Sequence, residues 1–159
     1  MPRNRRGVRA WALAGMPVDR LSPATAALIH MVEVSGRTGR EGPDAAAYDP
    51  DPYNEHVRPG HTAYLLRRYR RFLRRPGRVL WLEAAECSCG DCQYDDMAVV
   101  RDGLEEMARR LPPAASTELR RLLDRLDDEF ERRTVPDPVP RTGRRGEELP
   151  WWHLRVYQS

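Results

Sequence analysis

The stretch HTAYLLRRYRRFLRR, residues 61–75, predicts an amphipathic α-helix. Its apolar and aromatic side chains recur at steps of three and four residues: Leu65, Leu66, Tyr69, Phe72 and Leu73. This spacing places them on one face of an α-helix. Pro76 and Gly77 follow and end the helical pattern. We therefore expect an amphipathic helix whose apolar face lies in the core.

The opposite face of this helix is a dense group of basic residues: Arg67, Arg68, Arg70, Arg71, Arg74 and Arg75, continued by Arg78. No acidic residue interrupts them. Such a face can lie along a phosphate backbone, with Tyr64 or Tyr69 stacking on a base, or contact an acidic surface of another protein. It can equally stay solvated or dock on the acidic helices that follow in the chain. These seven arginines are the candidate partner-binding residues.

A shorter helix is predicted before this stretch. Ser22 is a suitable N-cap, and Pro23 suits the first helical position because it has no amide hydrogen to leave unpaired. The pattern predicts a helix to about Val34, stopped by Gly36. Residues 36–60 are rich in Gly, Pro and Asp and predict a long loop.

Two longer helices are predicted after the cysteines, and we expect them to form a hairpin. Asp95 or Asp96 can cap the first, in which apolar residues recur at helical steps from Met97 to Leu111. Two prolines break it, and residues 116–133 predict the second helix, with leucines and Phe130 on one face.

The segment RVLWLEA, residues 78–84, predicts a short buried strand, and WWHLRVYQ, residues 151–158, predicts an edge strand that pairs with it. The predicted fold is α+β and mainly helical: three or four helices with a small two-stranded sheet and a metal-binding turn. The expected organisation is a basic N-terminal arm (1–21), a helical core with the cysteine cluster (22–134), and a Pro/Gly-rich linker with a C-terminal strand packing on the core (135–159).

All three cysteines lie in CSCGDC, residues 87–92. The Cys-x-Cys-x-x-Cys spacing on a tight turn, with Gly90 free to adopt a positive φ, can bring three thiolates around one ion. Zinc prefers four donors, and His61, His56 or His153 can supply the fourth. The leading prediction is a structural zinc site with these ligands: Cys87, Cys89, Cys92 and His61.

Other interpretations of the hexapeptide remain open. The cysteines can hold a catalytic metal with an open position or an iron–sulfur cluster, or Cys89 and Cys92 can form a redox pair. They can also be buried thiols packed near a core strand. Independently of a metal, His56 and His61 flank a turn and can act as acid and base.

Composition excludes several mechanisms. The 159 residues suffice for one domain, and all 27 basic residues are arginine. Without lysine there is no Walker A loop and no pyridoxal Schiff base. The use of arginine in place of lysine also indicates GC-rich codons, so we expect a high-GC bacterial source. In such a source, a high arginine content is weaker evidence for nucleic-acid binding. Residues 1–82 carry 15 Arg and 7 acidic residues, whereas residues 83–159 carry 12 and 17.

The chain has no stretch near the roughly 20 apolar residues that a membrane span needs. Its opening imitates a secretory signal, but Gly15 and Pro17 break the apolar run. An odd number of cysteines fits a reducing cytoplasm better than a disulfide scaffold. We therefore expect a small cytoplasmic protein with no membrane partner.

The leading functional prediction is a zinc-binding module for an anionic partner, either nucleic acid or an acidic protein surface. On this hypothesis the metal is architectural, no bond is broken and no catalytic residue is assigned. One alternative is a metal-dependent or histidine-based, hydrolase-like enzyme with an open metal site. Another is an accessory interaction protein whose cysteines are incidental. The sequence predicts no oligomeric state.

Overall fold

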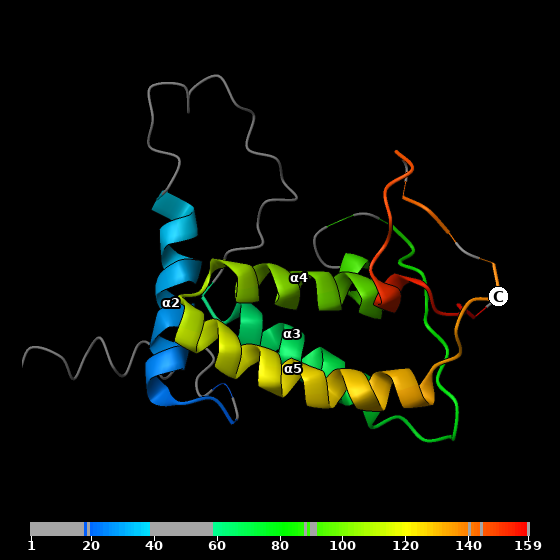
Figure 1. The fold of residues 1–159 in the computed structure, drawn as a ribbon, viewed down its shortest axis with the longest axis horizontal. Coiled ribbons are helices and arrows are strands. Elements are labelled where there is room, and N and C mark those ends of the chain that lie inside the picture. The colour runs from blue at the N-terminus through cyan, green and yellow to red at the C-terminus, as the bar shows by residue number, and fades with distance from the viewer. Residues whose placement is uncertain are drawn as a thin grey trace, which may run out of the picture.

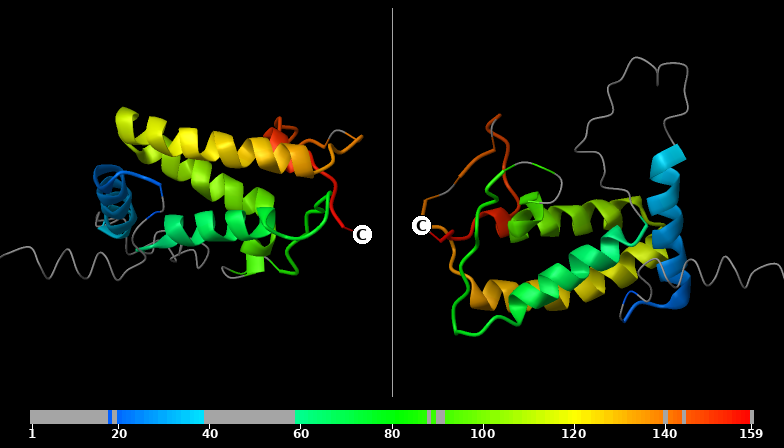
Figure 2. Two further views of the ribbon diagram at one scale, coloured as in Figure 1. Left: turned by 90° about the horizontal axis from the view of Figure 1, so that it is seen from below. Right: turned by 180° about the vertical axis from the view of Figure 1, so that it is seen from behind.

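The computed structural model describes residues 18, 20–38, 59–87, 89, 92–139, 141–143 and 145–158. The helices in these ranges are α2 (Pro23–Thr38), α3 (His61–Leu73), α4 (Met97–Arg110) and α5 (Pro113–Arg133), with the short 3-10 helices η3 (Cys92–Asp95) and η4 (Trp151–His153). Helices α3, α4 and α5 lie alongside one another, and α2 crosses one end of this bundle (Figures 1 and 2). The mainly helical fold is therefore confirmed. Most of the predicted arm and loop, with His56, lies outside the described residues.

Helix α3 packs against both α4 and α5, which also pack against each other. Its predicted apolar face is buried, and Tyr69 has no exposed surface at all. The carboxylate of Glu33, a buried residue of α2, accepts hydrogen bonds from the backbone N–H groups of Gly60 and Thr62 at 2.8 and 2.9 Å. A carboxylate is stabilised at the positive N-terminus of a helix, so Glu33 fixes the start of α3 on α2.

Helix α2 begins as predicted and is held to α5 at its start. The hydroxyl of Ser22 accepts a hydrogen bond from the backbone N–H of Thr25 at 3.2 Å and donates one to Glu118 of α5 at 2.8 Å. Glu118 also accepts from the Ser22 N–H and the Thr25 hydroxyl. The predicted end is wrong, since α2 continues through Gly36 to Thr38. A glycine costs a helix only about 1 kcal/mol relative to alanine, so it need not end one.

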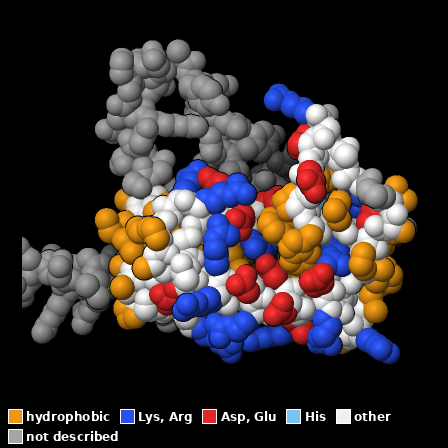
Figure 3. Space-filling model, viewed as in Figure 1, with side chains coloured by type: hydrophobic (Ala, Val, Ile, Leu, Met, Phe, Trp, Pro, Cys, Tyr) orange, Lys and Arg blue, Asp and Glu red, His pale blue; other side chains and the backbone are white. Residues whose placement is uncertain are grey.

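Helices α4 and α5 form the expected hairpin. Asp96 caps α4 by accepting a hydrogen bond from the N–H of Ala98 at 2.9 Å, and α5 begins at Pro113, earlier than predicted, because proline fits the first turn. On the outer face of this hairpin acidic and basic side chains intermingle (Figure 3). The ion pair of Glu106 and Arg110, with its oxygen and nitrogen 2.8 Å apart, is one example.

The hairpin also approaches α3 closely at one glycine. A methyl group in place of the Gly103 hydrogen would lie 2.6 Å from Cδ1 of Leu65, a side chain that is 1% exposed. Since such a separation is far below van der Waals contact, alanine at this position would force the Leu65 side chain to shift within the core.

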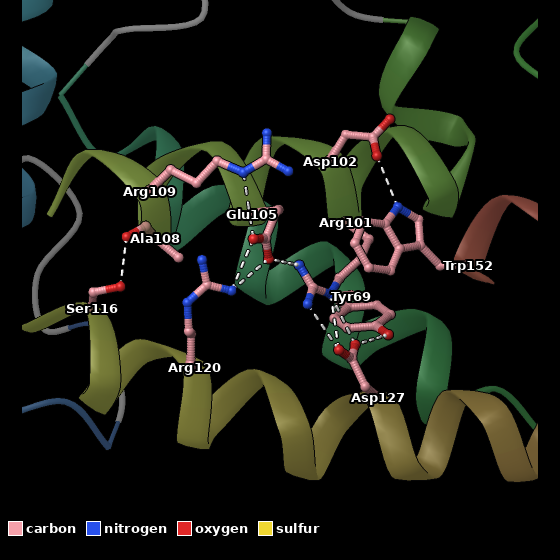
Figure 4. Close-up of polar contacts among 10 residues, drawn as sticks. All are labelled: Tyr69, Arg101, Asp102, Glu105, Ala108, Arg109, Ser116, Arg120, Asp127 and Trp152. Carbon is pink, nitrogen blue, oxygen red and sulfur yellow. Dashed lines mark hydrogen bonds and ion pairs between the residues drawn. The ribbon is translucent and has the colours of Figure 1, made fainter. Parts of the chain in front are cut away.

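A buried ionic network joins the three bundle helices (Figure 4). The Nε of Arg101 donates to both oxygens of Asp127 at 3.0 Å, and the hydroxyl of Tyr69 donates to Asp127 at 2.8 Å. Burial and the Asp127 charge raise the pKa of Tyr69, so its hydroxyl stays protonated as a donor. The guanidinium of Arg101 also pairs with Glu105 and lies 4.4 Å above the ring of Trp152.

The predicted two-stranded sheet is wrong. The described residues contain no strand, and the two segments meet only in an isolated parallel bridge between Leu82 and Tyr157. The backbone N–H groups of the first segment bond to two different parts of the chain. That of Leu80 donates to the carbonyl of Arg133 at 2.7 Å, and that of Leu82 donates to the carbonyl of Val156 at 3.3 Å. The second segment begins with η4, which is not extended. A continuous ladder cannot form under these conditions.

The C-terminal segment nevertheless covers the core at the end of the bundle opposite α2 (Figure 1). Trp152 is 8% exposed, and its indole N–H donates to Asp102 of α4 at 2.8 Å. Nε2 of His153 lies 2.7 Å from the same carboxylate.

Among the described helices, none is both long and apolar enough to span a membrane.

Candidate metal centre and arginine groove

Cys87 and Cys89 lie on the turn between the Leu80–Leu82 segment and η3, and Cys92 is the first residue of η3. Their sulfur atoms are all within 4.8 Å of one another, and those of Cys87 and Cys89 are 2.9 Å apart. Sulfur atoms that bind one tetrahedral zinc at 2.3 Å are about 3.8 Å from each other. This separation lies between the 2.9 Å of the Cys87–Cys89 pair and the 4.8 Å limit for the group. Cys87 and Cys89 are exposed, so the interpretation as buried core thiols is wrong.

The chemistry of the donor set fits a soft or borderline cation. Contact with Cys89 and Cys87 raises the pKa of Cys92 to about 12, because a thiolate is disfavoured beside two neighbouring sulfurs. A bound divalent cation reverses this effect and deprotonates coordinating thiols. Thiolates are the ligands preferred by zinc, Cu(I) and iron–sulfur clusters. The cluster could therefore hold a metal ion.

No histidine of the described residues belongs to this group. Nε2 of His61, in the first turn of α3, lies 3.3 Å from the hydroxyl of Tyr94. Burial and the neighbouring Tyr64 raise the pKa of Tyr94 to about 12, so this hydroxyl is protonated at neutral pH. His153 is bound to Asp102. The fourth ligand stays a prediction.

The arginine face of α3 is divided in two, and one part is engaged within the chain. Nε of Arg68 donates to the carbonyl of Tyr94 at 2.9 Å, and its Nη2 lies 2.6 Å from the carboxylate of Asp95. Arg75 pairs with Glu83 at 2.7 Å. The sequence left open whether the arginines pair with acidic residues of the same chain. Arg68 and Arg75 do so, and two of the seven candidate arginines are thereby neutralised.

The other part is a row of three exposed arginines along α3. Arg67, Arg71 and Arg74 follow one another at steps of four and three residues, and none of them makes an ion pair with any residue in the described ranges. Arg78, which lies beyond the end of α3, is also exposed.

Two adjoining hollows run beside this row and together form what we call the arginine groove. Their volumes are about 360 and 450 Å³, and Arg70 and Arg74 line both. The basic residues of the groove are Arg20, Arg67, Arg70, Arg71 and Arg74. Its apolar residues are Val18, Ala63, Leu66, Leu73 and Leu126, and its acidic residue is Glu129. The arrangement can bind an elongated anion.

Sequence reasoning missed Arg20 as a groove residue. It lies in the turn before α2, closed by the hydrogen bond from the N–H of Leu21 to the carbonyl of Val18 at 3.0 Å, and its φ is 73°. No local spacing relates this turn to α3, which lies about 50 residues further along the chain. No sequence pattern could therefore have identified Arg20, because only the folded structure brings it next to α3.

The predicted aromatic partners of a base do not line the groove. Tyr69 is 0% exposed, so the expectation that it stacks on a base is wrong. Tyr64 is 38% exposed, but its ring packs against those of His61 and Tyr94, with centroids 6.3 and 6.1 Å apart.

Comparisons with protein-family models, with curated proteins and with solved structures give no match for this chain. Its function is therefore argued from the sites themselves.

Proposed function

We propose that the protein is a zinc-binding module in which the three cysteines hold a structural ion and the arginine face of α3 contacts an anionic partner. The proposed metal site rests on one observation: the sulfur atoms of the three cysteines all lie within 4.8 Å of one another. They form the one group of three or more potential metal ligands within the described residues. Three free thiols suit a reducing compartment such as the cytoplasm.

The position of the turn supports an architectural role. On one side of it Leu80 and Leu82 are buried in the core, and on the other Asp96 caps α4. An ion that joins Cys87 to Cys92 would cross-link the two ends of this connection. Because such a site is absent from the unfolded chain, its binding free energy adds to the free energy of folding.

We further propose His61 as the fourth ligand. Its ring lies 5.3 Å from that of Tyr94, centroid to centroid, and Tyr94 follows Cys92 by two residues in η3. His153 is a weaker candidate because its Nε2 lies 2.7 Å from the carboxylate of Asp102, a closer and charged partner, whereas Nε2 of His61 lies 3.3 Å from the neutral hydroxyl of Tyr94. A fourth donor from the protein would close the site, as in structural zinc centres.

Native mass spectrometry tests the metal half. Protein purified without added metal is measured before and after a strong chelator, alongside the variant Cys87→Ser/Cys89→Ser/Cys92→Ser. We expect one zinc per chain in the wild type, none in the variant, and a clear loss of thermal stability with the metal. A metal-free wild type that melts at the temperature of the variant would contradict the proposal.

Two histidine variants test the fourth ligand. His61→Ala should lower the affinity for zinc, measured by competition with a coloured chelator, because one coordination position passes to water. His153→Ala is the matched control and should bind zinc as the wild type does. Equal zinc affinity in all three proteins would remove His61 from the site and leave the three cysteines in it.

The partner half rests on Arg67, Arg71 and Arg74. These side chains are exposed and lack a carboxylate partner in the described part of the chain, so they are available to an external anion. Arg68 and Arg75 are less available, since each is paired with an acidic residue.

A further inference from the structure

We infer that the arginine groove binds the phosphodiester backbone of double-stranded nucleic acid without reading its sequence. The inference rests on the proposed binding of an anionic partner and names the chemistry of that partner. It is independent of the metal, since no cysteine lines the groove.

The charge of the groove is strongly one-sided. Among the described residues, five arginines line it, against the single carboxylate of Glu129. That carboxylate is itself 2.7 Å from a guanidinium nitrogen of Arg132, which does not line the groove. A guanidinium stays protonated throughout the physiological pH range and binds phosphate oxygens in a bidentate manner. The groove therefore offers phosphates several fixed positive charges.

The spacing of the row fits a nucleic-acid strand. At a rise of 1.5 Å per residue, the Cα atoms of Arg67 and Arg74 are separated by about 10 Å along α3. Phosphates follow one another at about 3.4 Å along the axis of each strand of a duplex, so the row extends over about three of them. Seen from behind, α3 lies in front of α4 and α5 (Figure 2).

The floor of the groove argues against an acidic amphipathic helix as the partner. Such a helix gains affinity by burying apolar side chains in open apolar pockets. Three of the five apolar lining residues, Leu66, Val18 and Leu73, are only 1%, 3% and 7% exposed, and the other two, Ala63 and Leu126, are half-buried. A peptide could bury little beyond these last two side chains, so charge must supply most of the binding free energy.

The aromatic residues argue against a single strand. Proteins that bind single strands gain about 1–3 kcal/mol per base by stacking bases on aromatic side chains. None of the described residues that line the groove is aromatic, Tyr69 is fully buried and Tyr64 packs against Tyr94. A duplex keeps its bases stacked internally and presents its phosphates along the outside, where this surface can bind them.

The backbone of Arg20 gives an independent indication. Its φ of 73° lies in the left-handed region, which glycine adopts freely and other residues rarely do. The side chain lines the second hollow together with Arg70 and Arg74. An arginine where the turn favours glycine is explained by a need for its charge at this edge of the groove.

The test is fluorescence anisotropy with a labelled 20-base-pair DNA duplex of random sequence, titrated with the full chain at several salt concentrations. Two double variants remove the same charge: Arg67→Gln/Arg71→Gln in the groove and Arg68→Gln/Arg75→Gln outside it. With three to five phosphate contacts, the slope of log K against log salt should be about −3 to −4.5. The groove variant should reduce this slope by nearly two and weaken binding at least tenfold at low salt, while the second variant stays within about threefold of the wild type.

Arg20→Gly adds a variant that cannot act by unfolding the turn, because glycine fits a positive φ. It should weaken duplex binding several-fold and leave the melting temperature equal or higher. Circular dichroism confirms that each variant is folded before its affinity is compared.

Competition separates the possible partners. An unlabelled single strand of equal length and polyglutamate of equal charge should each displace the duplex less effectively than unlabelled duplex does. Equal or better competition by either one would overturn the inference, as would equal losses in the two double variants. Binding of polyglutamate without binding of duplex would keep the proposed anionic partner and reject the phosphodiester backbone, whereas binding of neither would reject both. The zinc measurement is unaffected by any of these results.

Discussion

Arg101 and Arg67 are the same residue type in opposite surroundings. Arg101 is 5% exposed, and burial disfavours its charge, but the hydrogen bonds and charges of Asp127 and Glu105 outweigh burial and raise its pKa. Arg67 is exposed and has no carboxylate partner in the described part of the chain. The first therefore serves the fold and the second is available to a partner.

Removing the main partner of Arg101 should be costly. Asp127→Ala leaves a buried guanidinium with one weaker partner and the hydroxyl of Tyr69 without its acceptor, so we expect a loss of about 3–5 kcal/mol in the free energy of unfolding. Urea denaturation measures it. The control Arg101→Met/Asp127→Leu removes both charges at similar volume and should cost much less. A single variant as stable as the wild type would show that the pair is not needed.

His153 should make stability depend on pH. The hydrogen bond with Asp102 raises the pKa of His153, against the opposing effect of its burial, and the charge of Asp96 adds to the increase while that of Arg141 opposes it. The charged imidazole thus stabilises the folded state below about pH 6.5, and this contribution disappears as pH rises through the elevated pKa. We expect roughly 0.5–1 kcal/mol.

The matched control for this effect is Asp102→Asn, which can still accept the Trp152 hydrogen bond but carries no charge. The difference in melting temperature between wild type and variant should be larger at about pH 5.5 than at about pH 9. A difference that is constant with pH would show that His153 does not titrate against Asp102.

Local features of single residues were predictable from the sequence. The caps formed by Ser22 and Asp96 depend only on neighbours within three residues, and the three cysteines lie within six positions of one another. The partners of Arg68 and the place of Arg20 depend on segments far apart in the chain, which no local pattern encodes.

At the scale of elements, helix periodicity was a reliable guide and strand pairing was not. An apolar face that recurs every three to four residues is a property of one segment, whereas a ladder requires two segments in register. The segments at Leu82 and Tyr157 do meet, but the backbone N–H of Leu80 donates its hydrogen bond to Arg133 of α5 and not to the C-terminal segment. Sequence pattern alone could not show that competition.

The contact between α3 and α4 gives a prediction about a helix interior. Gly103→Ala should raise helix propensity by about 1 kcal/mol, yet the added methyl group would meet the buried side chain of Leu65. Overpacking of this kind costs about 1–3 kcal/mol, so we expect net destabilisation. Thermal melts measure it. The double variant Gly103→Ala/Leu65→Ala should be less unstable than the sum of its two single variants, and simple additivity would argue against the contact.

At the scale of the whole molecule, the bundle is closed by α2 at one end and by the C-terminal segment at the other (Figure 1). The second closure depends on Trp152, which lies in the core, and on backbone hydrogen bonds that Leu82 makes with Val156 and Gln158. This segment follows a region that sequence composition marks as a linker, so its importance for the core was only partly predictable.

Ending the chain after Pro150 tests this closure. The loss of a buried tryptophan costs about 3–5 kcal/mol, which corresponds to a fall of about 10 °C in the melting temperature of a protein of this size. The helical circular dichroism signal at low temperature should largely remain, because α2 to α5 lie before the cut. Trp152→Ala in the full chain should reproduce most of the fall, and unchanged melting of both would show that the segment is dispensable.

The arginine groove has one more consequence, which concerns its control in a cell. Its positive charges are all guanidinium groups, and the chain contains no lysine. Acetylation of lysine side chains, a common way to neutralise a basic surface, has no substrate here. Nor does a change of pH within the physiological range discharge arginine. Occupancy of the groove would then respond to ionic strength, to competing polyanions and to the amount of protein made.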